Sequence, residues 1–525
     1  MSAAKGESIT IITNGHVITC DAQGRGGRLD LLIRDGRIME VSDRPDLFSS
    51  LHPYATIVDA SGKLIIPGFV NAHFHSESIL LRERTAGLHF SLWKRDLRLR
   101  EASQKLLSEE SYADIRSLYQ IAYFSHMKSG TTCVGEFPLP FNDKAFVQLL
   151  QAIDRTDVKA VVALQNWDQI RQAKELGAGA ARFMLNLGKE EDFTVYTFDN
   201  LLRAANEHNL PTVAHVAEQR EDAEIIRKNF QKNVLTVLRE YNALQQTSLA
   251  VHLNHITDAE VDAAVEAGLS VAISPYSSAR KQTGYPSLRA LISRGVPCCL
   301  STDWENTDML TEMQFLHQLP LVLPSMQHIA PLDILRMATI NGAVALGVGS
   351  ETGSIEAGKK ADLTFFSLRD VRIPPVDAHA TTTDLAELLL DDISSRNISD
   401  VMIDGEFYLS NHHLMTIDEE ELIEDRRVLH SKFFPSSKMR ASRIEEDTTR
   451  PRIIPFVLEL KKPGIPLEGF EEGFSVLNTA PPPQSRSSEP EQREPMPRRV
   501  PESSASGKPQ LPKDVKKVFG EDDEF

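Results

Sequence analysis

The stretch LIIPGFVNAHFHSE, residues 64–77, begins as an apolar strand and ends in two histidines, His73 and His75. In extended backbone, residues i and i+2 point to the same face, so the two imidazoles can reach one point in space. Histidines at this spacing are more often surface or hydrogen-bonded residues than metal ligands. The function of the pair therefore depends on what the rest of the chain places beside it.

Length and composition restrict the class of protein. The chain has 525 residues, of which 41% are hydrophobic, and can bury a large core. Its net charge of −17 argues against a nucleic-acid partner. Four cysteines without a repeated spacing favour a reduced protein, and no segment approaches the roughly 18 apolar residues of a membrane span. We therefore expect a cytoplasmic globular protein without a membrane or nucleic-acid partner.

Residues 67–357 repeat the order apolar strand, polar loop and amphipathic helix. The strand candidates are GFVNAHFH, GTTCVGEF, VKAVVALQNW, ARFMLNLG, LPTVAHVAE, SLAVHLNH, LSVAISP and VPCCLSTDW. Eight alternating units predict an α/β fold, a (β/α)8 TIM barrel. A doubly wound parallel sheet is the alternative, but it gives no reason for histidines at several strand ends.

Both ends of the chain outside the barrel contain short strands. Residues 8–66 alternate strands with turns, including a hairpin signal at Asp35-Gly36, and strand-like sequence returns in residues 358–414. Because so few strands need partners, we expect the two segments to form one composite β-sandwich. Residues 415–480 are predicted to be a helical and irregular extension, with a charged helix near 418–430. The proline-rich, charged residues 481–525 predict a disordered tail that could bind an unknown partner.

Candidate metal ligands stand at the carboxyl ends of four predicted barrel strands. His73 and His75 end the first strand, His215 the fifth, His252 the sixth and Asp303 the eighth. In a TIM barrel these strand ends meet at one face, where active sites form. Imidazole and carboxylate together suit zinc or iron, and the lack of paired cysteines argues against a closed structural zinc site. The sequence thus predicts a divalent metal at this face.

At this point the chain resembles the amidohydrolase superfamily, in its branch of aromatic deaminases and chlorohydrolases. The matching text is PGFVNAHFH, VAHVAE, AVH, STD and ATINGAVALGVGSETGSIEAGKKADLTFF. The resemblance implies that the metal is held by His73, His75, His215 and Asp303. It also implies that Glu218 and His252 act around the bound water.

Several positions differ from the pattern of this branch. The fourth strand, ARFMLNLG, has no lysine to bridge two metals, so the resemblance implies one metal per chain, with zinc the first choice and iron the alternative. Ser277-Ser278 replaces Ser-Asn after the strand-seven proline, and the basic pair Arg280-Lys281 follows. Gly-Thr-Asp becomes Ser301-Thr302-Asp303. These differences concern substrate recognition.

A hydrolytic mechanism follows from these residues. Asp303 would take a proton from the metal-activated water that attacks a ring carbon, and Glu218 would carry a proton to a ring nitrogen. His252 would hydrogen-bond the attacking oxygen. Two alternatives stay open: Glu218 caps the following helix, or His255 replaces His252.

The favoured reaction is hydrolytic deamination of a purine, pyrimidine or triazine-like ring. Hydrolysis of another cyclic C–N bond, as in an imidazolone or a cyclic amide, is the second hypothesis. An inactive scaffold whose tail binds a partner is the third.

The three tryptophans predict how a flat substrate is bound. Trp93, Trp167 and Trp304 are the only ones in the chain, and all follow predicted strand ends on the catalytic side. At least one indole is expected to stack on the substrate ring, with Trp93 the first choice because the resemblance places a tryptophan in this loop. Glu101 and Arg280 are further candidates for substrate contact. Substrate identity stays open, and so does the oligomeric state, for which a homo-oligomer is one possibility.

Overall fold

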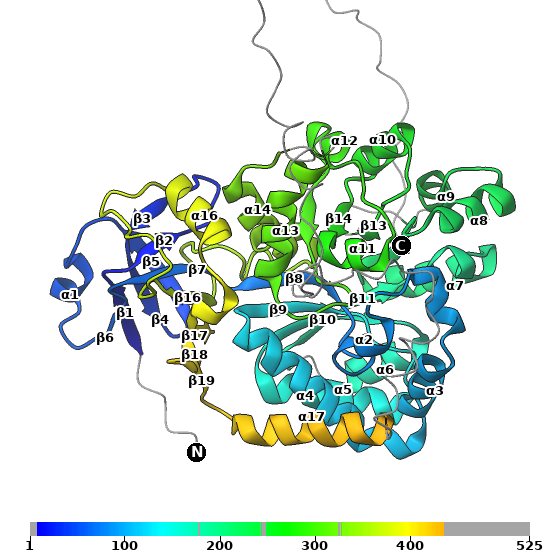
Figure 1. The fold of residues 1–525 in the computed structure, drawn as a ribbon, viewed down its shortest axis with the longest axis horizontal. Coiled ribbons are helices and arrows are strands. Elements are labelled where there is room, and N and C mark those ends of the chain that lie inside the picture. The colour runs from blue at the N-terminus through cyan, green and yellow to red at the C-terminus, as the bar shows by residue number, and fades with distance from the viewer. Residues whose placement is uncertain are drawn as a thin grey trace, which may run out of the picture. The chain divides into compact units, whose positions relative to one another are not determined.

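The computed structural model describes residues 8–434, except 177–178, 242, 244–247, 324–325 and 327. Its central sheet has eight parallel strands that neighbour one another in chain order (Figure 1). These strands are β8 (Phe69–Phe74), β9 (Thr131–Glu136), β10 (Lys159–Leu164), β11 (Ala181–Asn186), β12 (Thr212–Val216), β13 (Leu249–His252), β14 (Ser270–Ile273) and β15 (Cys298–Leu300).

The first and last strands meet just beyond the end of β15 and close the barrel. Asp303 N donates to His73 O at 2.9 Å, and His75 N donates to Asp303 O at 3.2 Å. The ladder between β8 and β9 is irregular between Asn71 and Phe74, an interval that contains His73, and His75 follows directly after β8. The predicted TIM barrel is confirmed, and three predicted metal ligands, His73, His75 and Asp303, make the backbone contacts that close it.

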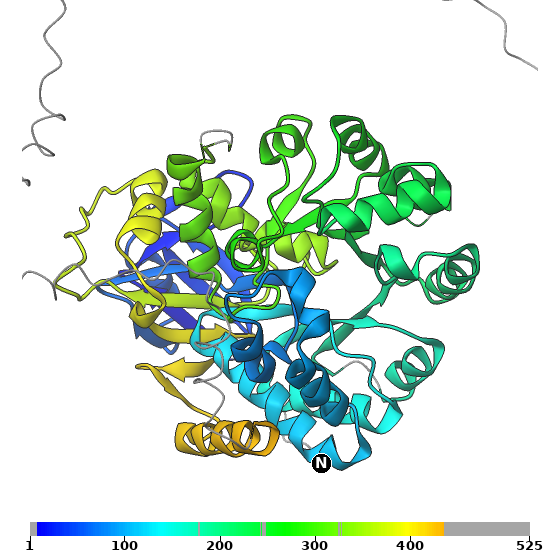
Figure 2. The same ribbon diagram turned by 45° about the vertical axis from the view of Figure 1, so that its right-hand side comes forward.

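Helices on the outside of the barrel connect successive strands, as Figure 2 shows. The α10 helix illustrates why they form where they do: Thr257 and Glu260 make a capping box at its start, and Gly268 ends it in the left-handed conformation. In chain order the helices are α2 (Ser78–Thr85), η1 (Phe90–Arg95), α3 (Leu97–Leu106), η2 (Glu109–Ser111), α4 (Tyr112–Lys128), α5 (Asp143–Thr156), α6 (Trp167–Leu176), η3 (Glu190–Asp192), α7 (Val195–His208), α8 (Arg220–Phe230), α9 (Val234–Glu240), α10 (Asp258–Ala267), α11 (Pro275–Lys281), α12 (Leu288–Ser293), α13 (Met309–Val322), α14 (Pro331–Met337) and α15 (Ile340–Ala345).

Alternating strand residues fill two separate parts of the core. In β10, Val161 and Ala163 belong to the cluster inside the barrel, whereas Ala160, Val162 and Leu164 pack in the layer that includes the helices. Strands buried on both faces in this way read as continuous apolar runs, which is how the sequence presents them.

Gly135 in β9 provides a test of how tightly the barrel strands are packed. A Cβ atom added at this position would lie 2.3 Å from the carbonyl oxygen of Ala72 in β8, so the two backbones would have to separate. We expect Gly135→Ala to lower the free energy of unfolding by at least about 1–3 kcal/mol, measured by urea denaturation.

Gly295→Ala is the matched control for this variant. Nothing lies within 4 Å of an added Cβ there, so only the left-handed backbone at φ +77° should be penalised, by about 1–2 kcal/mol. An unfolding free energy for Gly135→Ala equal to that of the wild type would show that the strands can shift without cost.

Two further sheets pack face to face beside the barrel. The seven-stranded sheet has the order β19 (His413–Leu414), β18 (Glu406–Ser410), β17 (Ile398–Ile403), β16 (Leu363–Ser367), β7 (Lys63–Pro67), β2 (His16–Ile18) and β3 (Gly26–Arg28). The four-stranded sheet has the order β5 (Arg37–Ser42), β4 (Asp30–Arg34), β1 (Ile9–Thr13) and β6 (Thr56–Asp59). Ile12 and Leu31 of the second sheet share a buried cluster with Ile65, Leu363 and Phe365 of the first.

The predicted composite β-sandwich is therefore confirmed, with one refinement. Antiparallel pairing of β16 with β7 joins the two ends of the chain in the seven-stranded sheet, whereas the four-stranded sheet contains N-terminal strands only. The short helices α1 (Leu47–Leu51), α16 (Thr382–Asp391) and η4 (Ser395–Asn397) complete this part.

The last described element is helix α17 (Glu419–Phe433), at the position predicted for a charged helix. Asp418 caps it, and Lys128 of α4 pairs with Glu419 at 2.5 Å. The rest of the predicted extension and the predicted disordered tail, residues 481–525, lie outside the described residues. A partner for that tail and a homo-oligomer stay predictions. In the part of the chain that the structure describes, every helix is too short or too polar to traverse a bilayer.

Candidate metal centre and active site

Left-handed backbone turns stand at the strand ends that carry the candidate ligands. Ala217 (φ 48°), His252 (φ 81°) and Asp303 (φ 52°) all adopt a conformation that is costly for residues other than glycine. Such strain costs about 1–3 kcal/mol per residue and is concentrated at functional sites in proteins. These turns redirect the chain just where β12, β13 and β15 end, beside the predicted ligands.

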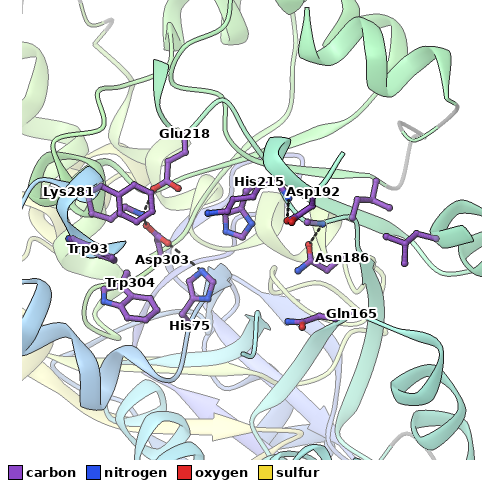
Figure 3. Close-up of a pocket in the computed structure, with 15 residues that line it drawn as sticks. His75, Trp93, Gln165, Asn186, Asp192, His215, Glu218, Lys281, Asp303 and Trp304 are labelled. Atoms are coloured by element: carbon purple, nitrogen blue, oxygen red, sulfur yellow. Dashed lines mark hydrogen bonds and ion pairs between the residues drawn. The ribbon is translucent and has the colours of Figure 1, made fainter. Parts of the chain in front are cut away.

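The structure brings the five predicted metal-binding and catalytic side chains of these strand ends together. The ring centroid of His73 lies 4.7 Å from that of His75 and 4.8 Å from that of His215, and the centroids of His215 and His252 are 5.5 Å apart. Asp303 Oδ1 lies 3.4 Å from His73 Nε2 and 3.8 Å from His75 Nε2. Figure 3 shows His75, His215 and Asp303 around one shared space.

The state of the histidines fits a divalent metal. Neither ring nitrogen of the buried His73 has a hydrogen-bond partner, which is costly unless another group binds there. His75 Nδ1 lies 2.8 Å from the carbonyl oxygen of Phe137, which directs its Nε2 lone pair toward the cluster. Burial lowers the pKa of His73 and of His252 to about 3 and that of His215 well below its usual value. The imidazoles are therefore neutral, as metal ligands must be.

The two carboxylate oxygens of Asp303 have different partners. Oδ1 faces the histidines, while Oδ2 accepts a hydrogen bond from Ser277 Oγ at 2.8 Å and another from the Lys281 ammonium. Burial by itself would raise the pKa of Asp303, but the Lys281 ammonium beside it holds that pKa well below its usual range. Asp303 is thus an anion with one oxygen free for a metal.

Glu218 lies between His252 and Lys281. Its Oε2 is 3.7 Å from His252 Nε2, and its Oε1 forms an ion pair with the Lys281 ammonium. Burial raises its pKa, and Lys281 opposes that shift. The N-terminus of α8 is closed by its own residues, because Gln219 N donates to Asp222 Oδ2 at 2.8 Å. Glu218 thus faces the site and makes no side-chain hydrogen bond to the helix end.

His252 and His255 have different surroundings. His252 contributes a ring nitrogen to two of the groups whose possible ligand atoms lie within 4.8 Å of one another. His255 Nε2 instead lies 2.8 Å from the carbonyl oxygen of Thr283. This geometry favours His252 over His255 for the role beside the metal.

A cavity of about 500 Å³ opens beside the cluster. Trp93, Trp304 and Phe90 form an aromatic wall, in which the two indoles are 5.5 Å apart and tilted by 51°. Trp304 Nε1 donates to Thr85 Oγ1 at 3.2 Å, which fixes its ring. A second cavity of about 580 Å³ shares Phe90, Trp93 and Lys189 with the first. Both volumes lie in the range of small-molecule sites.

Three predicted substrate contacts lie elsewhere among the described residues. Trp167 begins α6, is 40% exposed and packs edge-on against His208 at 5.5 Å. Glu101 is exposed on α3. Arg280 pairs with Glu305 at 3.0 Å. None of the three is among the described residues that line the 500 Å³ cavity.

The cavity also contains residues that the sequence analysis did not select. Gln165 and Asn186 follow or end β10 and β11 and line the cavity together with Lys189 and Lys281. The polar ends of the third and fourth barrel strands could have identified the first two, by the rule that indicated His215 and His252. Lys281 was noted only because the Arg280-Lys281 pair departs from the pattern of the branch.

Comparison with known proteins identifies the family. The sequence profile of the amidohydrolase family matches residues 64–407, which include all five residues around the shared space. The chain belongs to the amidohydrolase family. The family predicted from PGFVNAHFH and the other matching segments is therefore confirmed.

The relatives include named deaminases. A 5-methylthioadenosine/S-adenosylhomocysteine deaminase from Syntrophomonas wolfei subsp. wolfei is 28% identical over 399 residues, covering 71% of this chain and 87% of the relative. A 5'-deoxyadenosine deaminase from Methanosarcina mazei is 25% identical over 443 residues, covering 79% and 96%. The solved structure of an adenosine deaminase from Xanthomonas campestris with bound zinc matches with a TM-score of 0.72 and 21% identity, over 81% of this chain and 99% of that chain.

Proposed function

We propose that this chain is a metal-dependent hydrolase that deaminates an aminated heterocycle. The observation that carries the proposal is the position of Glu218, a buried carboxyl at the edge of the metal cluster that faces a cavity with an aromatic wall. One divalent ion, zinc first and iron second, would be held by His73, His75, His215 and Asp303. When bound, such an ion supplies a water that is nucleophilic near neutral pH.

Each side chain has a role that its surroundings support. Asp303, an anion beside the histidines, accepts the proton of the attacking water. Glu218, whose pKa is raised by burial, delivers a proton to a ring nitrogen. His252, neutral and adjacent to Glu218, hydrogen-bonds the attacking oxygen. The new bond joins the water oxygen to the ring carbon, and the bond from that carbon to the amino nitrogen breaks. The proton accepted by Asp303 goes to the amino group, which leaves as ammonia, and Glu218 regains a proton from the new hydroxyl as the ring carbonyl forms.

The relatives indicate which heterocycles to test first. Their names contain 5-methylthioadenosine, S-adenosylhomocysteine and 5'-deoxyadenosine, all with a 6-aminopurine ring. We therefore place adenine nucleosides first, followed by guanine, aminopyrimidines and aminotriazines. The test is ammonia release from this panel by the zinc-loaded protein. Release from an imidazolone or cyclic amide control, with none from any aminated ring, would contradict deamination.

Trp93 provides a test of the aromatic wall. It is 8% exposed and lines the cavity next to Trp304, so its indole can contact a flat ring. We expect Trp93→Ala to raise KM several-fold with the metal retained, because stacking contributes about 0.5–1.5 kcal/mol beyond area burial. The assay is steady-state kinetics on the best compound of the panel.

Trp167→Ala is the matched tryptophan variant. Trp167 is 40% exposed and is not among the described residues that line the cavity, so we expect no change in KM. Equal KM values for Trp93→Ala and the wild type would contradict stacking of Trp93 on the substrate. A higher KM for Trp167→Ala alone would support the sequence prediction for that residue over the geometry.

A further inference from the structure

A lysine ammonium lies between the two carboxylates of the proposed active site. Lys281 is the last residue of α11, which follows β14, and its side chain is only 3% exposed. Its Nζ pairs with Glu218 Oε1 and with Asp303 Oδ2 (Figure 3). These carboxylates come from the ends of β12 and β15, so one side chain connects three strand ends of the barrel.

Aromatic rings border the same ammonium. Its Nζ lies 4.8 Å from the ring centroid of Phe90 and 5.8 Å from that of Trp93. Cation–π contacts and two carboxylates thus replace the water that a lysine normally keeps around its charge. A buried ion pair is tolerated only where the geometry is this complete, so the side chain has little freedom to move.

The ammonium uses one oxygen of each carboxylate and leaves the other oxygen facing the histidines. On Asp303, Lys281 and Ser277 bind Oδ2, while Oδ1 lies 3.4 Å from His73 Nε2. On Glu218, Lys281 pairs with Oε1, while Oε2 lies 3.7 Å from His252 Nε2. Ligand atoms of Glu218 and Asp303 lie within 4.8 Å of each other, so without the ammonium the two buried carboxylates would repel each other.

We propose that Lys281 is a positioning residue of the hydrolytic site, which fixes the orientation of the Glu218 and Asp303 carboxylates toward the substrate and the histidines. The catalytic part of this inference rests on the proposed function. The orientation of Asp303 beside the candidate metal ligands does not depend on any substrate. The inference can therefore be tested by two measurements, one with substrate and one without.

The chain contains a matched control at the opposite end of the barrel. Lys159, the first residue of β10, is also bound by two carboxylates, with Nζ 2.8 Å from Asp362 Oδ1 and 2.8 Å from Asp404 Oδ1. If Lys281 had only a structural role, Lys281→Met and Lys159→Met should therefore have similar effects on Tm and on kcat.

The first measurement is steady-state kinetics of the zinc-loaded full chain. We expect Lys281→Met to lower kcat by about 100-fold, the cost of displacing a reacting group by about 1 Å, with KM within about threefold and zinc retained. Lys281→Arg keeps the charge in a different geometry and should give an intermediate kcat with wild-type zinc content and Tm. Lys159→Met should lower Tm without lowering kcat.

The second measurement is the visible d–d absorption of the cobalt(II)-substituted proteins. It should change in Lys281→Met, because the Asp303 carboxylate is then free to turn, and stay unchanged in Lys159→Met. If the wild type releases no ammonia from any panel compound, the proposed function fails while these spectra still test Lys281.

Three results would overturn the inference. They are wild-type kcat in both Lys281 variants, a cobalt spectrum of Lys281→Met identical to that of the wild type, and loss of the metal in step with activity. If Lys281→Met does not fold, Lys281→Arg decides: a lowered kcat with full zinc and unchanged Tm supports the inference, and a wild-type kcat overturns it.

Discussion

The His215→Ala and Asp303→Ala variants should each purify without most of the metal found in the wild type. Each variant deletes one of the four proposed ligands, which come from three different strand ends, and a zinc site depends on every protein ligand to hold its ion. The loss should also abolish ammonia release, because a water without a metal has a pKa of about 15.7 rather than about 7. The measurement is metal content by elemental analysis after identical purification.

His255→Ala is the control for these variants. This histidine is near the cluster in sequence, but its Nε2 bonds the carbonyl oxygen of Thr283, so the variant should keep its metal. Full metal content in both His215→Ala and Asp303→Ala would sink the assignment of the ligands. Loss of metal from His255→Ala would instead favour the alternative in which His255 takes part in the site.

The barrel and its cluster were predictable because the signals are local in sequence. Most barrel strands are buried on both faces and read as apolar runs, and each candidate ligand stands at or just after the end of such a run. Parallel strands bring these ends to one face, so strand order did not need to be known. His73 and His75 share a face in extended backbone, but the pair became a metal prediction only together with His215, His252 and Asp303 at other strand ends.

Other features depend on tertiary geometry that strand patterns do not contain. Lys281 reaches Glu218 and Asp303 from the end of α11. Its charge is buried because the segments that contain these three residues meet in the folded protein, which the sequence does not reveal. Its neighbour Arg280 looks equivalent in sequence, yet its guanidinium pairs with Glu305. Helical residues one position apart point in directions about 100° apart, so the last turn of α11 decides which of the two lines the cavity.

The tryptophans make the same point for loops. Trp93 and Trp304 line the cavity because the segment with η1 packs against the turn after β15, with the two indoles 5.5 Å apart. Trp167 follows a strand end as well, but it begins α6 and packs against His208 of α7. A position after a strand gives the correct end of the barrel, whereas the direction of the side chain depends on how the next helix starts.

Glu218→Gln should lower kcat by about 100-fold or more and leave the metal in place. Glutamine has nearly the shape of glutamate, so the space beside His252 stays filled, but an amide cannot carry a proton to a ring nitrogen. Glu218 also lies outside the proposed ligand set, and its Oε1 pairs with Lys281 rather than with a histidine. The loss should therefore appear in kcat and in kcat/KM alike, as expected when an interaction made in the transition state is removed.

Glu224→Gln, an exposed position on α8, is the control for losing one negative charge near this strand end and should keep wild-type kinetics. Metal content distinguishes the two roles that Glu218 could have. A low kcat with full metal supports proton transfer, because the cluster is then intact and only the chemistry is slow. Wild-type kcat would remove Glu218 from the mechanism, and with it the observation on which ring deamination rests, while the ligand set would be unaffected. A low kcat together with lost metal would instead indicate that Glu218 is a metal ligand, because the substitution would then have removed a ligand and not only a proton donor.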